Sequence, residues 1–179
     1  MKNLFGLLSR TAAKNANACA LMSPNQVGRL GEQFTYQELK SISAGLAMHL
    51  KGAFSTEKGA VIVSDLPNIS ENLILQLACA NLNVSFATVK DTAGLNSLRD
   101  SHNVVGIVPG MKDSWLTEKF GSSNTLLGGD FESAAKEWLE RGAVIEDSNS
   151  ELASYNVNTD TEDLPHAYFN STKALSGGT

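Results

Sequence analysis

The stretch Ala60-Val-Ile-Val-Ser64 decides the fold class of this chain. Short runs rich in β-branched residues are typical of strands that are buried on both faces of a parallel sheet. An apolar helix is predicted from Ser70 to Leu82, and Val84 to Val89 has the composition of the next strand. Because strands that alternate with helices build βαβ units, we predict an α/β fold with a mainly parallel sheet flanked by helices.

The alternation extends in both directions from this unit. Thr35 and Glu38 have the spacing of a capping box, which predicts the start of a helix. The further predicted helices cover 3–16, 36–52, 95–102, a segment around Trp115, and 131–142, and the further strands cover 18–22, 104–108, 125–127 and 166–170. Asn83 follows the helix that ends at Leu82, where a left-handed residue is expected.

The apolar spacing predicts which side of each helix is buried. The expected buried residues are Leu4, Leu7, Leu8 and Ala12 in the first helix, Leu39, Ile42, Leu46 and Leu50 in the second, and Leu73, Leu77 and Ala80 in the third.

Composition limits the class of protein. The chain has 179 residues and a formal net charge of −5, and this acidic balance argues against a nucleic-acid-binding domain. Two cysteines are too few for a disulfide scaffold or a Cys-rich zinc site. The longest apolar runs fall far short of the roughly 20 residues that a membrane span needs, so we expect no transmembrane segment.

Charge is distributed unevenly along the chain. Residues 1–31 contain four basic residues and no acid, which is typical of a mitochondrial transit peptide. The alternative is an ordinary first surface helix in a cytoplasmic protein. In contrast, ten of the 19 acidic residues lie between Asp130 and Asp163.

Several short segments together resemble the start of the adenylate-forming enzymes, the superfamily of acyl-CoA synthetases, luciferases and peptide-synthetase adenylation domains. The segment Phe34-Thr-Tyr-Gln-Glu-Leu39 is similar to their Thr-Tyr-x-Glu-Leu helix start, and Leu66-Pro-Asn68 with Ser70 and Glu71 is similar to their Leu-Pro-Asn-Ser-x-Glu turn. Four further segments fit in the same order, namely 44–50, 58–63, 77–89 and 100–108. The resemblance covers residues 3–110 and implies the fold of the N-terminal subdomain of these enzymes.

The same resemblance points to a phosphate-binding loop near the end of the chain. In the family a Gly-, Ser- and Thr-rich loop wraps the phosphates of ATP, whose metal is Mg²⁺, and Ser171, Thr172 and Lys173 are the candidate residues for that role here. Thr172 and Leu175, however, stand where the family has glycines, and the Pro-Lys-Gly end of the loop is absent. Because a β-carbon hinders the close backbone approach that glycine permits, the resemblance implies a degenerate loop.

These observations divide the chain into four segments. We expect an N-terminal helix or transit segment over 1–16, the α/β domain over 17–146, an acidic loop or linker over 147–164 and the degenerate phosphate loop over 165–179. No catalytic residue is assigned, because the adenine, ribose and catalytic-lysine motifs of the family lie beyond the length of this chain.

Two hypotheses for function follow. The first is a non-catalytic structural or interaction subunit of a larger, mitochondrial assembly, without a cofactor, bound to other protein subunits and peripherally associated with a membrane complex. The alternative is the N-terminal fragment of an ATP-dependent acid–CoA ligase, which would use ATP and Mg²⁺. A regulatory module for acyl-CoA or a fatty acid is a third alternative that no residue supports.

The remaining chemistry-bearing residues suggest no site. His49, His102 and His166 lie on separate predicted elements without the spacing of metal ligands. Cys79 and Cys19 are both expected to be buried small apolar residues. The acids Asp160, Glu162 and Asp163 could bind a cation but also fit a solvated loop, so no metal site is predicted.

Overall fold

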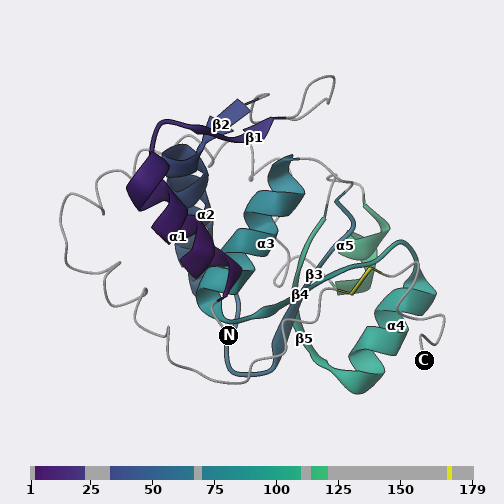
Figure 1. Cartoon of the computed structure of the whole chain (residues 1–179). Coiled ribbons are helices and arrows are strands. Elements are labelled where there is room, and N and C mark those ends of the chain that lie inside the picture. Colours follow the sequence, from purple (N-terminus) through teal and green to yellow (C-terminus); the bar gives the residue numbers. More distant parts are fainter. Residues whose placement is uncertain (1–2, 23–32, 67–69, 110–113, 121–168, 171–179) are drawn as a thin grey trace, which may run out of the picture.

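The computed structural model describes residues 3–22, 33–66, 70–109, 114–120 and 169–170 (Figure 1). Its helices are α1 (Leu4–Asn15), α2 (Tyr36–Ala53), α3 (Ser70–Leu82), α4 (Thr92–Ser101) and α5 (Trp115–Phe120), and its strands are β1 (Cys19–Met22), β2 (Gln33–Thr35), β3 (Ala60–Ser64), β4 (Ser85–Thr88), β5 (Asn103–Val108) and β6 (Phe169–Asn170). The elements predicted over 125–127 and 131–142, the acidic segment 147–164 and residues 166–168 lie outside the described residues.

The main sheet has the strand order β5-β3-β4-β6, and each neighbouring pair is parallel. From β3 the chain passes through α3 to β4 on one side, and then returns through α4 to β5 on the other side of β3. Because such connections are right-handed, a reversal of direction places the two helices on opposite faces of the sheet. The predicted α/β fold with a mainly parallel sheet is confirmed.

Helices cover both faces of this sheet. Figure 1 shows α1, α2 and α3 on one side of the strands and α4 and α5 on the other. Alternate residues of β3 belong to separate hydrophobic clusters: Ile62 packs with the first group of helices, whereas Val61 and Val63 pack with the second. Every residue of β3 is buried, which is why this strand has an uninterrupted run of small and β-branched residues.

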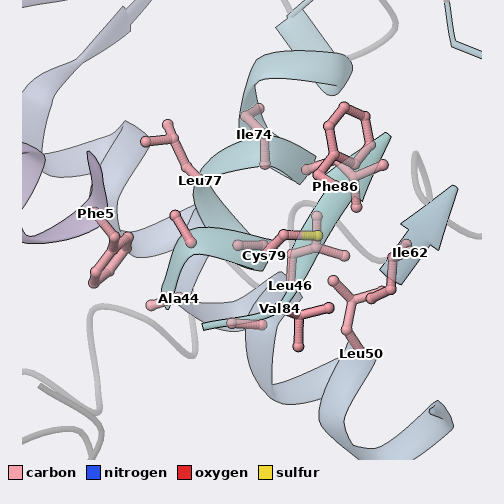
Figure 2. Close-up of a cluster of buried hydrophobic side chains, with 14 of the residues drawn as sticks. Phe5, Ala44, Leu46, Leu50, Ile62, Ile74, Leu77, Cys79, Val84 and Phe86 are labelled. Atoms are coloured by element: carbon pink, nitrogen blue, oxygen red, sulfur yellow. The ribbon is translucent and has the colours of Figure 1, made fainter. Parts of the chain in front are cut away.

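The larger cluster is built from all three helices on its face of the sheet. Phe5 of α1, Leu46 of α2 and Leu77 of α3 belong to the same cluster as the strand residues Ile62 and Phe86 (Figure 2). The four residues predicted to line the buried stripe of α2 are all buried, as expected from their spacing.

The ends of the helices follow local chemistry. At the start of α2, the Thr35 hydroxyl accepts from the Glu38 backbone N–H at 3.2 Å, and the Glu38 carboxylate accepts from the Thr35 N–H at 2.8 Å, so the capping box is confirmed. Asn83 ends α3 with a φ of 55°, the left-handed conformation predicted for it. A small antiparallel sheet of β1 and β2 precedes α2.

Three local predictions are wrong. In α1, Leu4 and Leu7 are exposed, and the buried stripe is formed by Phe5 with Leu8 and Ala12. Phe5 and Leu4 lie three and four residues before Leu8, so helical spacing fits both, and the bulkier ring of Phe5 occupies the core.

Helix α4 also begins at Thr92, three residues before the predicted start at Leu95. The Asp91 carboxylate, which accepts from the Gly94 N–H at 2.8 Å, caps the helix there. Finally, Cys19 is exposed at the first position of β1, whereas Cys79 is buried as predicted.

Candidate functional site

The candidate site lies at the carboxyl ends of the parallel strands. In α/β sheets ligands bind outside these ends, at the point where successive connections leave toward opposite faces. Here β3 leads to α3 on one face and its neighbour β4 leads to α4 on the other. The strand order reverses at β3, because the chain goes first to β4 on one side and then to β5 on the other, so the residues that follow β3 and β5 form the candidate site.

Ser64 is the last residue of β3 and joins the ends of two strands. Its hydroxyl donates to the Val108 carbonyl at the end of β5 at 2.6 Å, and its oxygen accepts from the Leu66 backbone N–H at 3.0 Å. The side chain is fully buried. Its hydrogen-bonding capacity is thus used to hold β3, β5 and the following turn together.

Asp65, the next residue, is bonded to the start of α5. The Ser114 hydroxyl donates to Asp65 Oδ2, and Ser114 Oγ also accepts from the Leu116 backbone N–H at 3.2 Å. Ser114 is buried. This pair attaches the short helix α5 to the turn that leaves β3.

Asn72 closes the other side of the same turn. Its side-chain amide donates to the Leu66 carbonyl at 3.1 Å, and its Oδ1 accepts from the side chain of Gln76 at 2.8 Å. We call Ser64, Asp65, Asn72 and Ser114 the carboxyl-edge cluster. The sequence resemblance matched the turn at 66–71 but did not identify this cluster, although polar residues directly after a buried strand could have indicated it.

Strand β6 ends at the same edge, directly before the predicted phosphate loop in the sequence. Ala87 pairs with Phe169 and Thr88 with Asn170, so the chain leaves β6 beside the end of β4. Ser171, Thr172 and Lys173 follow immediately and lie outside the described residues. Two strand spacings separate β6 from β3, so the end of β6 lies about 10 Å from the end of β3. An exposed lysine, Lys90, follows β4 at this edge.

The carboxyl-edge cluster by itself does not suit a phosphate group. The hydroxyl hydrogens of Ser64 and Ser114 are both donated within the protein, and Asp65 adds a carboxyl group. A phosphate site needs donors and positive charge directed at the ligand. The fit of ATP therefore depends on Lys90 and on residues after β6.

The other candidate residues are dispersed. His49 is exposed near the end of α2, and His102 is exposed at the end of α4. His166 and the acids of residues 160–163 lie outside the described residues. Burial raises the pKa of the Cys79 thiol, which keeps it protonated and unreactive.

The described residues hold neither a group of potential metal ligands nor a helix suited to crossing a membrane. In that part of the chain, no group of three or more His, Cys, Asp and Glu side chains is arranged to hold a metal ion. Nor does any helix there combine the length and the hydrophobicity needed to cross a bilayer.

Similarity to known proteins was found in solved structures. No protein-family profile matches the sequence, and no curated protein matches it. VinN is 16% identical over 79% of this chain and 36% of its own, with a TM-score of 0.65. An artificially fused adenylation–PCP di-domain NRPS, NpsA-ThdA from Klebsiella oxytoca, is 14% identical over 77% of this chain and 25% of its own, with a TM-score of 0.61.

O-succinylbenzoate coenzyme A synthetase (MenE) from Bacillus subtilis, solved with ATP and magnesium, is 21% identical over 73% of this chain and 34% of its own, with a TM-score of 0.58. The chain therefore has the fold of the N-terminal subdomain of adenylate-forming enzymes, as the sequence resemblance implied. It spans between a quarter and just over a third of the length of these similar structures.

Proposed function

We propose that this chain is a non-catalytic structural or interaction subunit of a larger protein assembly, built on an acyl-CoA synthetase-like fold. The observation that carries the proposal is the carboxyl-edge cluster. Its serine hydroxyls and the Asn72 amide form hydrogen bonds to other parts of the same chain. In a ligand-binding site, by contrast, such polar atoms are directed at the ligand. Here the cluster fastens α3, α5, β3 and β5 together.

The sequence after β6 supports the same proposal. Thr172 and Leu175 occupy positions at which the resemblance expects glycines. Their β-carbons oppose the close approach of backbone N–H groups to a phosphate. A loop of this kind is poorly suited to wrapping ATP.

The proposed setting is a mitochondrial assembly in which the partners are other protein subunits. The basic, acid-free residues 1–31 support this location. The acidic remainder of the chain argues against nucleic acid as a partner. Association with a membrane complex would be peripheral under this proposal.

The proposal is tested by isolating the tagged chain from its own cells under native conditions. We expect it to migrate in an assembly much larger than 19.0 kDa, with the same partner subunits in each preparation, and to fractionate with mitochondria. Calorimetric titration of the purified chain with ATP and Mg²⁺ should show no saturable binding. A lone monomer in the native extract, or saturable micromolar ATP binding, would overturn the proposal.

A stability measurement tests the role of the carboxyl-edge cluster directly. If the cluster is structural, Asp65→Ala should lower the free energy of unfolding by about 1–2 kcal/mol, because the buried Ser114 hydroxyl loses its acceptor. Asp100→Ala, at an exposed position of α4, is the matched control and should change it by less than about 0.5 kcal/mol. A more stable Asp65→Ala variant would indicate a ligand site, since such sites are commonly maintained at the expense of stability.

The second candidate is the N-terminal part of an ATP-dependent acid–CoA ligase. It is favoured by the fold and by the exposed Lys90 at the edge where β6 ends. Reading the transcript beyond the codon for Thr179 separates the two candidates. An open frame of several hundred codons would support the ligase, and a stop codon would support the subunit.

A further inference from the structure

Helix α1 combines the features of a targeting segment with those of a core element. Its side chains Phe5, Leu8 and Ala12 are 3%, 8% and 1% exposed and form what we call the core face of α1. Phe5 and Leu8 belong to the larger hydrophobic cluster, and the helix packs against both α2 and α3. Figure 2 shows the Phe5 ring directed toward this cluster.

Asn3 fastens the beginning of α1 to the end of α3. Its Oδ1 accepts from the Gly6 N–H at 2.7 Å and caps α1. Its Nδ2 donates to the Ala80 carbonyl at 3.0 Å and to Asn83 Oδ1 at 3.4 Å. One side chain thus caps the first helix and binds the residues that terminate a helix 77 positions later in the chain.

The segment after α1 is bonded to the beginning of α2. The Gln37 N–H donates to the Ala16 carbonyl at 3.1 Å, and the Tyr36 N–H donates to the Ala18 carbonyl at 3.0 Å. These carbonyls therefore satisfy backbone donors in the first turn of α2, which have no partner within their own helix. Both ends of α1 are fixed to the body of the domain.

The basic side chains lie on the opposite side of the helix. Arg10 and Lys14 are exposed, together with Leu4 and Leu7 at 36% and 48%. The features that resemble a transit peptide are therefore separate from the core face. Removal of the helix would uncover apolar surface of α2 and α3 and delete the Asn3 hydrogen bonds.

We infer that α1 is a permanent part of the folded protein and remains attached after the protein reaches its compartment. Any targeting by its basic side chains acts before the chain folds and is not followed by cleavage within or directly after the helix. The inference rests on the packing of α1 and does not depend on the proposed function. ATP binding would overturn that function and leave this inference intact.

Mass spectrometry of the protein isolated from its own cells is the direct test. Trypsin should release the peptide Asn3–Arg10, and the intact mass should include all residues of α1. A mature chain that begins within α1 or shortly after Asn15 would overturn the inference.

A matched pair of leucine substitutions in the full-length chain supplies a second test. Leu8→Ala should lower the melting temperature by about 5–15 °C or prevent folding, because it removes a buried side chain of the core face. Leu7→Ala makes the same chemical change one residue away at an exposed position and should shift it by less than about 2 °C. Equal melting temperatures for the two variants would overturn the inference, as would a stable, cooperatively folded variant that lacks residues 2–16.

Discussion

Gly106 lies where strand β5 is crossed by an aromatic ring. A β-carbon at this position would lie 2.6 Å from Cδ1 of Phe54, the buried residue that follows α2. The register between β3 and β5 shifts just before the pairing of Ile62 with Gly106. The absence of a side chain allows the ring to pack directly on the strand, which no pattern in the sequence indicated.

We therefore expect Gly106→Ala to lower the free energy of unfolding by about 1–3 kcal/mol, because the Phe54 ring must move to make room. Urea denaturation followed by circular dichroism measures this change. Gly52→Ala is the matched control: it lies in α2 with nothing within 4 Å of the added β-carbon, and it should be neutral or stabilise by up to about 1 kcal/mol. Equal effects of the two substitutions would contradict the packing described here.

The two cysteines differ in exposure, so their thiols should differ in reactivity. Cys19 is exposed, whereas Cys79 is buried in α3. In the native protein we expect a disulfide reagent to modify the Cys19 thiol rapidly and the Cys79 thiol only after unfolding. The rapid phase should be absent in Cys19→Ser. Rapid modification of both thiols in the native state would show that the helix layer opens easily.

The same burial predicts a pH dependence of stability. Because the pKa of Cys79 is raised in the folded state, only the unfolded chain releases this proton as the pH rises above about 8.5. The stability contributed by the neutral thiol is complete below that pH and decreases above it. Between pH 9 and pH 10 the free energy of unfolding should fall by about 1 kcal/mol more in the unmodified protein than in Cys79→Ala, as measured by urea denaturation at each pH. Parallel curves for the two proteins would show that the thiol ionises in the folded state.

At the scale of single elements, the capping box of α2 links sequence to structure most directly. Thr35→Ala removes the acceptor of the Glu38 N–H and should lower the free energy of unfolding by about 1 kcal/mol. Thr11→Ala makes the same change inside α1, where the hydroxyl only donates to the Leu7 carbonyl, and should be neutral or slightly stabilising. Thermal denaturation of the two variants distinguishes a cap from an ordinary helical threonine. A larger loss in Thr11→Ala would contradict this assignment.

Elements were predictable from sequence where their signals are local. The β-branched run of β3, the capping box and the turn at Asn83 each depend on a few neighbouring residues, and each is confirmed. The buried side of α1 was not predictable, because Phe5 and Leu4 both satisfy helical spacing and only contact with α2 and α3 selects Phe5. Local spacing thus fixes the period of a helix more closely than its orientation.

At the scale of the molecule, the fold class could be predicted from the sequence, whereas the contacts of the candidate site could not. The alternation of strands and helices is enough to predict an α/β fold with a parallel sheet. The carboxyl-edge cluster joins Asp65 to Ser114 across 49 positions of the chain, and such a contact exists only once β3 and β5 are paired. Sequence therefore indicated the residues near the turn and not the contact that closes it.

Strand β3 is the element on which the described part of the molecule depends. It pairs with β4 along one edge and β5 along the other, and its residues contribute to both hydrophobic clusters. Exposing its amides to solvent requires both helix layers to separate, which is a global event. We expect the amides of Val61, Ile62 and Val63 to exchange with deuterium most slowly, at a rate set by global unfolding.

The small sheet of β1 and β2 supplies the internal comparison for this hydrogen-exchange experiment. The strand β1 is at most half-buried and pairs with β2 alone among the described strands, so its amides should exchange through local opening, faster than those of β3. Added urea should accelerate exchange in β3 strongly and in β1 weakly, because only global unfolding exposes a large surface. Exchange in β3 as fast as in β1 would mean that the two helix layers separate independently, and the α/β unit would then lack the single cooperative core that its topology implies.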